Sequence, residues 1–466
     1  MDMGSSPAPS RSVRWRDRKR YLWLIALVMP MLPFAAIGLH IWTQWSVWLW
    51  LGPIVILGLV PVIDWVVGRD GASAPDDQIA ALEADRYYRW LTYAFLPIQY
   101  AGFIAGMFYI ARGGLSVMEG VGLAVTLGFI GGIGINTAHE LGHKRESHER
   151  WLSKIALAQC GYGHFYIEHN RGHHVRVATP QDPASSRLGE SFYAFWPRTV
   201  LGSALSAWQL ESSRLVRRKK NPWRLSNDVI NAVAMTVVLW GAILIWLGPG
   251  MIGYILLQAF IGITLLEAVN YLEHYGLLRQ KVMHGDRERY ERVEPRHSWN
   301  SNNIATNVLL YHLQRHSDHH AHPIRRYQAL QDDEQAPVLP TGYAGMILLA
   351  LVPPMWRRVM DPRVLAHYEG DTRLANLTPR WRRRLENGDA TLLLPVADVG
   401  SQTIPPQAQG SITACPECGF IYDPKVGAPR EGFAQGTPWR DVPDNWTCPD
   451  CGVREKSDFV PVSVAG

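Results

Sequence analysis

The chain has 466 residues, of which 47% are hydrophobic and 19% are charged, with a net charge of +5. This length suffices for several domains. The apolar residues are gathered in long runs rather than spread evenly, so the composition indicates a membrane protein and not a wholly soluble one. No nucleic-acid partner is expected.

Six of these runs can each cross about 30 Å of hydrocarbon. They cover residues 21–42, 45–67, 91–110, 115–138, 229–247 and 251–271. Residues 11–20 contain six lysines and arginines, whereas the short turns between paired runs contain one charged residue, Arg112. Because positive charge marks the cytoplasmic side, residues 1–20, the long connections and both termini are predicted to be cytoplasmic. The first run lacks the cleavage pattern of a signal peptide, so we expect it to remain as a span.

Histidines are concentrated after the fourth run, because 15 of the 17 lie between residues 139 and 322. They form four clusters: His139-Glu-Leu-Gly-His143, Glu168-His169-Asn-Arg-Gly-His173-His174, Asn270-Tyr-Leu-Glu273-His274-Tyr-Gly276 and His312-Leu-Gln-Arg-His316-Ser-Asp-His319-His320-Ala-His322. In the first two clusters a four-residue step predicts two histidines on one helical face, and a helix would also align residues 312, 316, 319 and 320. Converging neutral imidazoles are typical of a metal site. Two clusters stand at the ends of spans, so this site is expected at the cytoplasmic membrane face.

The first cluster also fits the zinc metalloprotease pattern, in which two histidines bind zinc and the glutamate between them is the general base. A membrane-embedded metalloprotease is therefore an alternative. One catalytic zinc requires three protein ligands, whereas nine histidines in four clusters favour two metal ions. The acids Glu140, Glu168, Glu273 and Asp318 are predicted to accept hydrogen bonds that fix the imidazole rings.

The remaining histidines are assigned no metal. His312 is predicted to lie on the same helical face one turn before His316, and to support a ligand or be a plain helix residue rather than bind metal itself. No spacing partner demands metal at His148, His164, His284, His297 and His322.

Two composition changes follow the sixth run. Residues 343–355 are apolar but too short to span, and Pro353 and Pro354 interrupt them, so an interfacial or re-entrant piece is predicted. Residues 396–411 are rich in Gly, Ser, Thr, Gln and Pro, which is typical of a flexible linker. This places a membrane domain at 21–395 and a small domain at 412–466.

The small domain contains two Cys-x-x-Cys pairs, Cys415 with Cys418 and Cys448 with Cys451. In a chain that faces the cytoplasm these pairs favour metal binding over disulfides. Four thiolates suit zinc and iron equally well. Residues 412–466 hold eight acidic and five basic side chains, a net charge of −3, which leaves +8 on the rest. We therefore expect the small domain to dock on the basic cytoplasmic face.

Both parts of the chain resemble known families. Two Cys-Pro-x-Cys-Gly elements, with Tyr422-Asp-Pro and Asp441-x-Pro-x-x-Trp446 between them, resemble rubredoxin, which implies one iron on Cys415, Cys418, Cys448 and Cys451. The four histidine clusters resemble the signature boxes of the integral-membrane alkane hydroxylases, over residues from about 20 to 395. That resemblance implies a non-haem diiron centre with the ligands His139, His143, His169, His173, His174, His274, His316, His319 and His320.

The combined resemblance implies terminal hydroxylation of n-alkanes to 1-alkanols with O2, at two irons in the membrane domain. It implies electrons from the rubredoxin-like domain, a flavin-dependent rubredoxin reductase that uses NADH or NADPH, and the inner membrane of a bacterium. Fatty-acyl hydroxylases and desaturases have related boxes and are a second alternative. The expected fold is mainly α, with six transmembrane helices, a cytoplasmic helical layer that carries the histidines, and the small rubredoxin-like domain.

An alkane that lies end-on to the metal site would reach toward mid-bilayer. Asp64 marks the cytoplasmic end of the second run, so Ile56 should lie about 12 Å deeper in a regular helix. Gly52 and Leu59 would share its face. These three residues are the predicted wall of a substrate channel.

Overall fold

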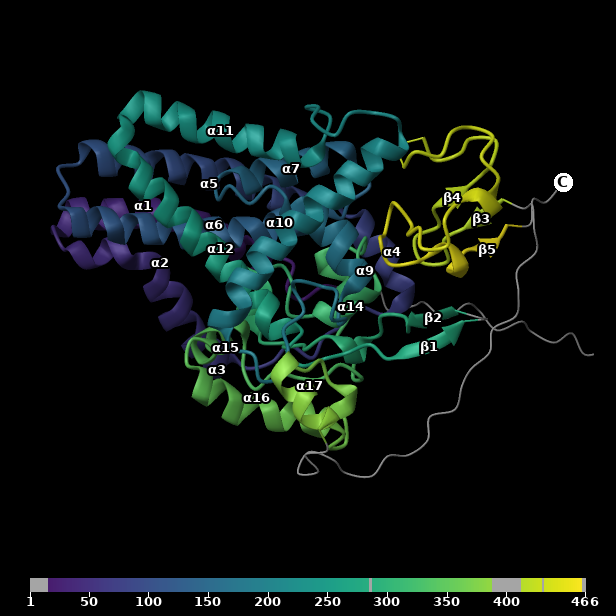
Figure 1. Ribbon diagram of the computed structural model, residues 1–466. Helices are drawn as coiled ribbons and strands as arrows, with labels where there is room; N and C mark the ends of the chain where they lie inside the picture. The colour runs from purple at the N-terminus through teal and green to yellow at the C-terminus, as the bar shows by residue number, and fades with distance from the viewer. Residues whose placement is uncertain (1–15, 285–286, 388–411, 430, 463–466) are drawn as a thin grey trace, which may run out of the picture.

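The structure is a computed structural model that describes residues 16–284, 287–387, 412–429 and 431–462. Long helices form most of the chain, and a small unit with short strands follows at 412–462 (Figure 1). The predicted fold class is confirmed. Most of the basic segment at 1–20, and the whole linker predicted at 396–411, lie outside the described residues.

Among the described residues, six helical stretches are long and apolar enough to cross a membrane, and each contains nearly all of one predicted run. They are Leu22–Thr43 (which includes α1, Val28–Thr43), Ser46–Val67, α5 (Arg86–Arg112), α6 (Val117–Gly142), α11 (Asp228–Leu247) and Pro249–Glu273 (which includes α12, Ile252–Glu273). Neighbouring spans are joined by tight turns at one end of the bundle, on the left in Figure 1. The long connections and the small unit gather at the other end.

The second span is irregular. It begins as a 3-10 helix (Ser46–Trp50), continues through α2 (Leu51–Pro53) and a π-helix (Ile54–Leu59), and ends as α3 (Val60–Val67). Pro53 and Pro61 each lack a backbone N–H, which breaks the regular ladder of hydrogen bonds. The regular spacing assumed for Gly52, Ile56 and Leu59 therefore does not hold.

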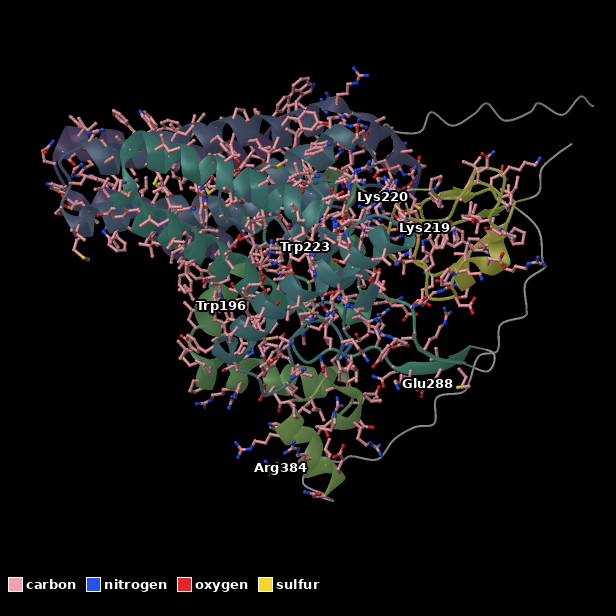
Figure 2. The ribbon with its side chains drawn as sticks, turned by 45° about the horizontal axis from the view of Figure 1, so that its top comes forward. Trp196, Lys219, Lys220, Trp223, Glu288 and Arg384 are labelled. Atoms are coloured by element: carbon pink, nitrogen blue, oxygen red, sulfur yellow. The ribbon has the colours of Figure 1, made fainter. Side chains whose placement is uncertain are left out.

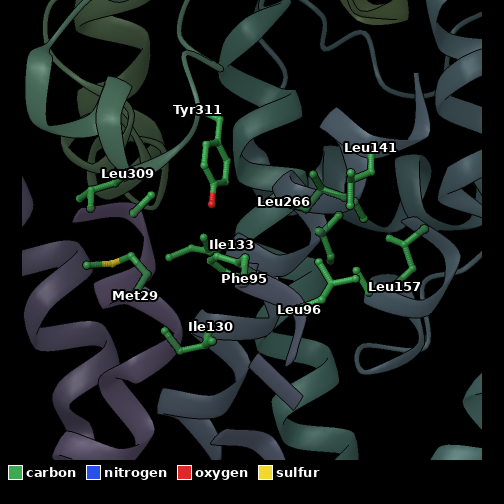
Figure 3. Packing of buried hydrophobic residues seen from close by; sticks show 14 of the residues in the cluster. Met29, Phe95, Leu96, Ile130, Ile133, Leu141, Leu157, Leu266, Leu309 and Tyr311 are labelled. Atoms are coloured by element: carbon green, nitrogen blue, oxygen red, sulfur yellow. The ribbon is translucent and has the colours of Figure 1, made fainter. Parts of the chain in front are cut away.

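Helix α6 is the centre of the membrane part. Gly128 and Gly132 let α12 approach closely, because a Cβ at these positions would lie 2.6 Å from the Ile261 Cβ and 2.8 Å from a Leu265 methyl carbon. Figure 3 shows the apolar core around α6, where residues of α1, α5, α7 and α12 interdigitate. This packing holds the end of α6 that carries His139 in one place.

Helix α7 (Ser147–Ala158) corrects the expectation that everything between the fourth and fifth spans is cytoplasmic. The Gln159 carbonyl oxygen accepts hydrogen bonds from Trp240 Nε1 at 3.0 Å and from Gln258 Nε2 at 2.8 Å. Both partners lie inside membrane helices, so α7 re-enters the bundle. Its 12 residues are too few to span and include both polar and apolar side chains, so no apolar run marked it.

The long helix α10 and a set of shorter elements complete the layer outside the six spans. They are α4 (Asp76–Ala84), α8 (Phe165–Glu168), a π-helix (His169–His173), α9 (His174–Arg176), α10 (Phe192–Arg217), the β1–β2 hairpin (Lys281–His284 and Arg287–Tyr290), α13 (Ile304–Leu309), α14 (His316–Ala321), α15 (Tyr343–Ala350), α16 (Pro353–His367) and α17 (Pro379–Glu386), with 3-10 turns between them. The piece predicted at 343–355 contains α15, which is largely buried and packs beside α12. Pro353 and Pro354 begin α16, where prolines are tolerated.

The small unit is built on a three-stranded antiparallel sheet. Strand β3 (Thr413–Ala414) lies between β4 (Ile421–Tyr422) and β5 (Val460–Pro461). Its core is aromatic and includes Tyr422, Phe433, Trp446 and Phe459. The four cysteines are buried in the same cluster.

Candidate metal centres

The nine predicted histidines meet in two groups, although they come from four separate segments. The first group contains His139, His143, His169, His174 and His319, and the second contains His173, His274, His316 and His320. Within each group all candidate ligand atoms lie within 4.8 Å of one another, and every side chain is buried. The groups are neighbours, because the rings of His174 and His320 have centroids 4.3 Å apart.

Ring nitrogens within each group face one another at short range. In the first group Nε2 of His139 is 2.9 Å from Nε2 of His319, and Nε2 of His174 is 3.1 Å from that of His169. In the second group Nε2 of His316 is 3.1 Å from that of His274 and 2.9 Å from that of His320. Nitrogen lone pairs that converge so closely are typical of atoms that share a cation.

The second cluster departs from the predicted four-residue step. Residues 169–173 form a π-helix, in which bonding reaches five residues rather than four. This turn brings His169 and His174 into the first group and sends His173 to the second. One π turn thus distributes the histidines of a single segment over both groups. The four-residue step does hold for His139 and His143, which both belong to the first group.

The fourth cluster is helical only from His316 onward. In α14 His316 and His320 enter the second group, while His319 points to the first. His312 lies outside the helix with a φ of 55°, which corrects the prediction that it shares the face of His316. Its Nε2 is 2.7 Å from the Lys19 ammonium, and its Nδ1 is 2.8 Å from the Tyr327 carbonyl oxygen. His312 therefore fastens the N-terminal segment to the layer and belongs to neither group.

Burial favours the neutral form of seven of these imidazoles. It lowers the pKa of His143, His169, His174, His316, His319 and His320 well below the usual value, and lowers the pKa of His274 to about 3. A neutral imidazole keeps a nitrogen lone pair for a metal. Nε2 of His143 and Nε2 of His173 are also buried without a hydrogen-bond partner among the described residues. The donor set fits metal ions.

One acid that the sequence did not single out as a partner orients a histidine. Nδ1 of His173 lies 2.9 Å from a carboxylate oxygen of Asp182, which also accepts a 2.6 Å hydrogen bond from the Ser185 hydroxyl. This contact directs Nε2 of His173 into the second group. Asp182 follows His173 by nine residues in an irregular loop, so no helical spacing pointed to it.

The four acids beside the clusters behave differently from one another. Glu273 places an oxygen 3.2 Å from Nε2 of His316, inside the second group. The other three face away from the histidine groups, toward cations: Glu140 toward Lys144 at 3.0 Å, Glu168 toward Arg176 at 2.7 Å, and Asp318 toward Arg325 at 2.7 Å. The prediction that all four fix imidazole rings is therefore wrong for Glu140 and Glu168, while Asp318 contacts His322, which is outside both groups, at 2.9 Å.

The four cysteines form a second kind of site. Sγ of Cys415 is 3.8 Å from Sγ of Cys451, and Sγ of Cys418 is 3.4 Å from Sγ of Cys448. All four are buried, and their sulfur atoms lie within 4.8 Å of one another. Two loops thus bring four sulfurs around one point, which fits a single tetrahedral metal ion.

The small unit docks on the histidine layer through its cysteine loops. Arg145, two residues after His143, donates a hydrogen bond to the Cys418 carbonyl oxygen. Gly452 packs against the Asn170 carbonyl oxygen so closely that a Cβ would not fit. Asn170 directly follows His169. Both cysteine loops therefore contact residues that stand beside histidines of the first group.

Charge complementarity surrounds this contact, as predicted. Arginines of the large unit face acids of the small one at Arg145–Asp450 (3.6 Å), Arg171–Glu431 (3.6 Å), Arg289–Glu455 (3.6 Å) and Arg292–Asp458 (2.7 Å). Arg289 lies on β2, so the hairpin extends the docking surface. His322, for which no metal role was predicted, lies 3.4 Å from Glu417.

An apolar cavity lies on the membrane side of the histidines. Its walls come from the first two spans, α6, α12, α13 and α15, and include Met29, Ile56, Val60, Ile133, Leu265, Leu309 and Ile347. It reaches Asn136, one turn before His139, and Tyr343. Of the three residues predicted to form the channel, Ile56 lines this cavity. Gly52 packs against Thr126, and Leu59 is 50% exposed.

Sequence comparisons agree with this arrangement. The family described as Fatty acid desaturase matches residues 117–350, and the Rubredoxin family matches residues 413–459. Alkane 1-monooxygenase 1 of Alcanivorax borkumensis is 46% identical over 370 residues, which cover 79% of this chain and 91% of that protein. Alkane 1-monooxygenase of Acinetobacter baylyi is 46% identical over 382 residues, covering 81% and 92%. The xylene/toluene monooxygenase hydroxylase component XylM of Pseudomonas putida is 26% identical over 314 residues, covering 66% and 80%.

The metalloprotease alternative receives no support, because Glu140, which would be its general base, is paired with Lys144 and turned away from the histidine groups. The helices, the two kinds of metal-binding cluster and the relatives point to one conclusion: the chain belongs to the alkane 1-monooxygenase family of membrane oxidoreductases and carries a rubredoxin domain.

Proposed function

We propose that this enzyme hydroxylates the terminal carbon of n-alkanes to 1-alkanols at two iron ions held by the nine histidines. The observation that carries the proposal is the position of the two histidine groups, between an apolar cavity in the membrane part and the docked rubredoxin domain. The first group would hold one iron and the second group the other. A fatty-acyl hydroxylase or desaturase is the alternative, because the Fatty acid desaturase family matches residues 117–350, but the relatives that are 46% identical over most of the chain are alkane 1-monooxygenases.

The reaction consumes one alkane, one dioxygen, two electrons and two protons, and yields one alcohol and one water. Reduced iron, when bound, supplies the dioxygen activation that breaks an unactivated C–H bond. The protein's own residues supply orientation. Asp182 holds His173 by Nδ1, and the buried neutral rings present their free nitrogens to a common point. Glu273 adds one carboxylate at the second group.

The apolar cavity favours a hydrocarbon substrate. Nearly all of its lining side chains are apolar, and Asn136, Thr306 and Tyr343 are the polar exceptions. Its free volume of about 50 Å³ admits the end of a chain, so a longer alkane would displace side chains toward the lipid. Ile56 on the irregular second span is the proposed contact for the far part of the chain. Gly52 and Leu59 are no longer proposed as channel wall.

Electrons are proposed to reach the histidine site from an iron on Cys415, Cys418, Cys448 and Cys451. The contact between Gly452 and the Asn170 carbonyl leaves a short covalent path through one peptide unit to His169. The Arg145 contact with Cys418 offers a second path beside His143. A flavin-dependent rubredoxin reductase that uses NADH or NADPH would reduce this iron in turn.

The same arrangement supports a location in the bacterial inner membrane with both termini cytoplasmic. The rubredoxin domain, the histidine layer and Lys19 all lie at the same end of the span bundle. Positive residues before the first span favour the cytoplasm for that end. The proposed domains are a membrane domain at 21–395, a linker at 396–411 and an electron-transfer domain at 412–466.

Metal analysis combined with product identification tests the proposal. We expect about three irons per chain, one on the cysteines and two on the histidines, and a 1-alkanol from an n-alkane when reductase, reduced nicotinamide and oxygen are supplied. Zinc in the histidine site, or desaturated product without alcohol, would contradict it. Removal of iron by a chelator should abolish activity, and added ferrous iron should restore it.

A further inference from the structure

A polar pocket that contains none of the proposed metal ligands lies where the start of α7 meets the connection between α10 and α11. It has a volume of about 280 Å³, and its lining includes Ser147, Arg150, Lys154, Arg218, Ser226 and Asp228. Because the α11 span begins at Asp228, the pocket stands at the depth where lipid headgroups meet hydrocarbon.

Positive charge dominates this pocket. Residues 214–224 contain six lysines and arginines and no acid. The lining carboxylate, Asp228, is already paired with Lys154 at 3.1 Å. Glu211, which approaches from α10, is engaged by Arg171 and Arg214. Among the described residues no carboxylate lies within ion-pairing distance of Arg150 or Arg218. Nη1 of Arg150 donates a hydrogen bond to the Arg145 carbonyl oxygen at 2.9 Å, which leaves its positive charge unneutralised.

Tryptophans border the pocket on the membrane side. Trp151 is 48% exposed, and the Lys154 ammonium lies 3.7 Å from the centroid of its ring. Trp223 is 76% exposed and packs against Trp208, with ring centroids 4.6 Å apart. Figure 2 labels Trp223 on the connection between α10 and α11, together with Lys219 and Lys220. Tryptophans and basic residues at one level are typical of a membrane–water interface.

Exposed apolar side chains continue from the pocket toward the hydrocarbon. Ile155 on α7 is 38% exposed, and Val233 and Val237 on α11 are 49% and 63% exposed. Because α11 is a membrane span, these side chains lie against acyl chains of the bilayer. A phospholipid that packs its acyl chains on them would bring its phosphate to the arginines.

We propose that this pocket binds the headgroup phosphate of an anionic phospholipid. Arg150 and Arg218 donate charge-assisted hydrogen bonds to the phosphate, and the hydroxyl groups of Ser147 and Ser226 donate to the remainder of the headgroup. Helix α7 carries Gln159 into the bundle, so a bound headgroup fixes the re-entrant helix at its cytoplasmic end.

The test is native mass spectrometry of the full iron-loaded chain with phosphatidylglycerol or phosphatidylcholine of identical acyl chains. We expect phosphatidylglycerol to be retained and phosphatidylcholine to be retained about tenfold less. The double variant Arg150→Gln/Arg218→Gln should lower phosphatidylglycerol retention by about tenfold. The matched control Arg380→Gln/Arg383→Gln removes the same charge from exposed positions of α17 and should retain the lipid.

A second variant distinguishes loss of the binding site from misfolding of the double variant. Ser226→Glu keeps both arginines, changes an exposed side chain and adds a carboxylate to the pocket, and should cause the same loss of lipid. Inorganic phosphate distinguishes a lipid site from a free-phosphate site, because it should displace little phosphatidylglycerol at millimolar concentration. Complete displacement by phosphate, equal retention of both lipids, or unchanged retention in both pocket variants would overturn the proposal.

Discussion

The histidine site and the cysteine site are built in opposite ways. The histidines span residues 139–320 and come from four segments, two of which end membrane helices. The cysteines span residues 415–451 and come from two loops of one small sheet. The first site therefore depends on the packing of the whole membrane part, whereas the second depends on local turns. A substitution in the histidine site should therefore abolish all hydroxylation. A substitution in the cysteine site should stop electron delivery while leaving the histidine site intact.

The two sites also differ in charge. Neutral imidazoles leave the charge of their metal ions largely uncompensated, whereas four thiolates more than neutralise one iron ion. The rubredoxin domain is accordingly held by arginines of the membrane part, including Arg145 and Arg292. Opposite charge at the two sites favours their close approach.

The largest effect is expected from the histidines. His319→Ala removes a ring that meets His139 and His174, and it should abolish hydroxylation and lower iron content. His143→Ala and His173→Ala should do the same. Iron analysis and product formation measure both effects.

His322→Ala is the control for this series, because His322 follows α14 and contacts Asp318 and Glu417 but neither histidine group. It should retain iron. Loss of iron equal to that in His319→Ala would show that the assignment of ligands is wrong.

The next largest effect tests whether the cysteine site can be lost without loss of the histidine site. Cys448→Ser should stop turnover driven by reductase and reduced nicotinamide while the histidine site keeps its iron. Free rubredoxin should restore part of the activity. A tethered domain acts at an effective concentration of about a millimolar, so the rescue should need much free donor. A fully active variant without added rubredoxin would exclude the domain as the electron donor.

A smaller effect is expected at Asp182, which orients one histidine from outside the four clusters. Asp182→Asn preserves shape but weakens the bond to Nδ1 of His173, and should lower iron affinity or activity by about 10- to 100-fold. Ser185→Ala removes the other partner of this carboxylate and should have a weaker effect. If Asn at 182 leaves iron affinity and turnover unchanged, the carboxylate has no role in orienting His173.

The smallest effect concerns chain length and leaves both metal sites intact. Ile56→Trp adds volume to the cavity wall, so the relative rate with hexadecane should fall while that with octane is spared. Leu59→Trp is the matched control, because Leu59 is half-exposed outside the cavity. If both variants show the same relative rates from octane to hexadecane, Ile56 does not contact the substrate.

Spans and clusters were predictable because each has a local signal in the chain. A run of about 20 apolar residues marks a span, and repeated histidines mark the metal site. The division of ligands was not predictable, because a single π turn at residues 169–173 redirects His173. Asp182 and α7 were also missed. A loop residue has no periodicity, and a short helix of mixed polarity is buried only by partners that are distant in sequence.

The apolar cavity has a consequence for how substrate preference is measured. If the alkane enters from the bilayer, the reaction rate depends on the mole fraction of alkane in the lipid. Added lipid therefore dilutes the substrate even when the aqueous volume is constant. Each methylene favours transfer out of water by about 0.8 kcal/mol, or roughly fourfold. An apparent KM expressed per volume of water will therefore fall with every added carbon, without any contribution from the residues that line the cavity.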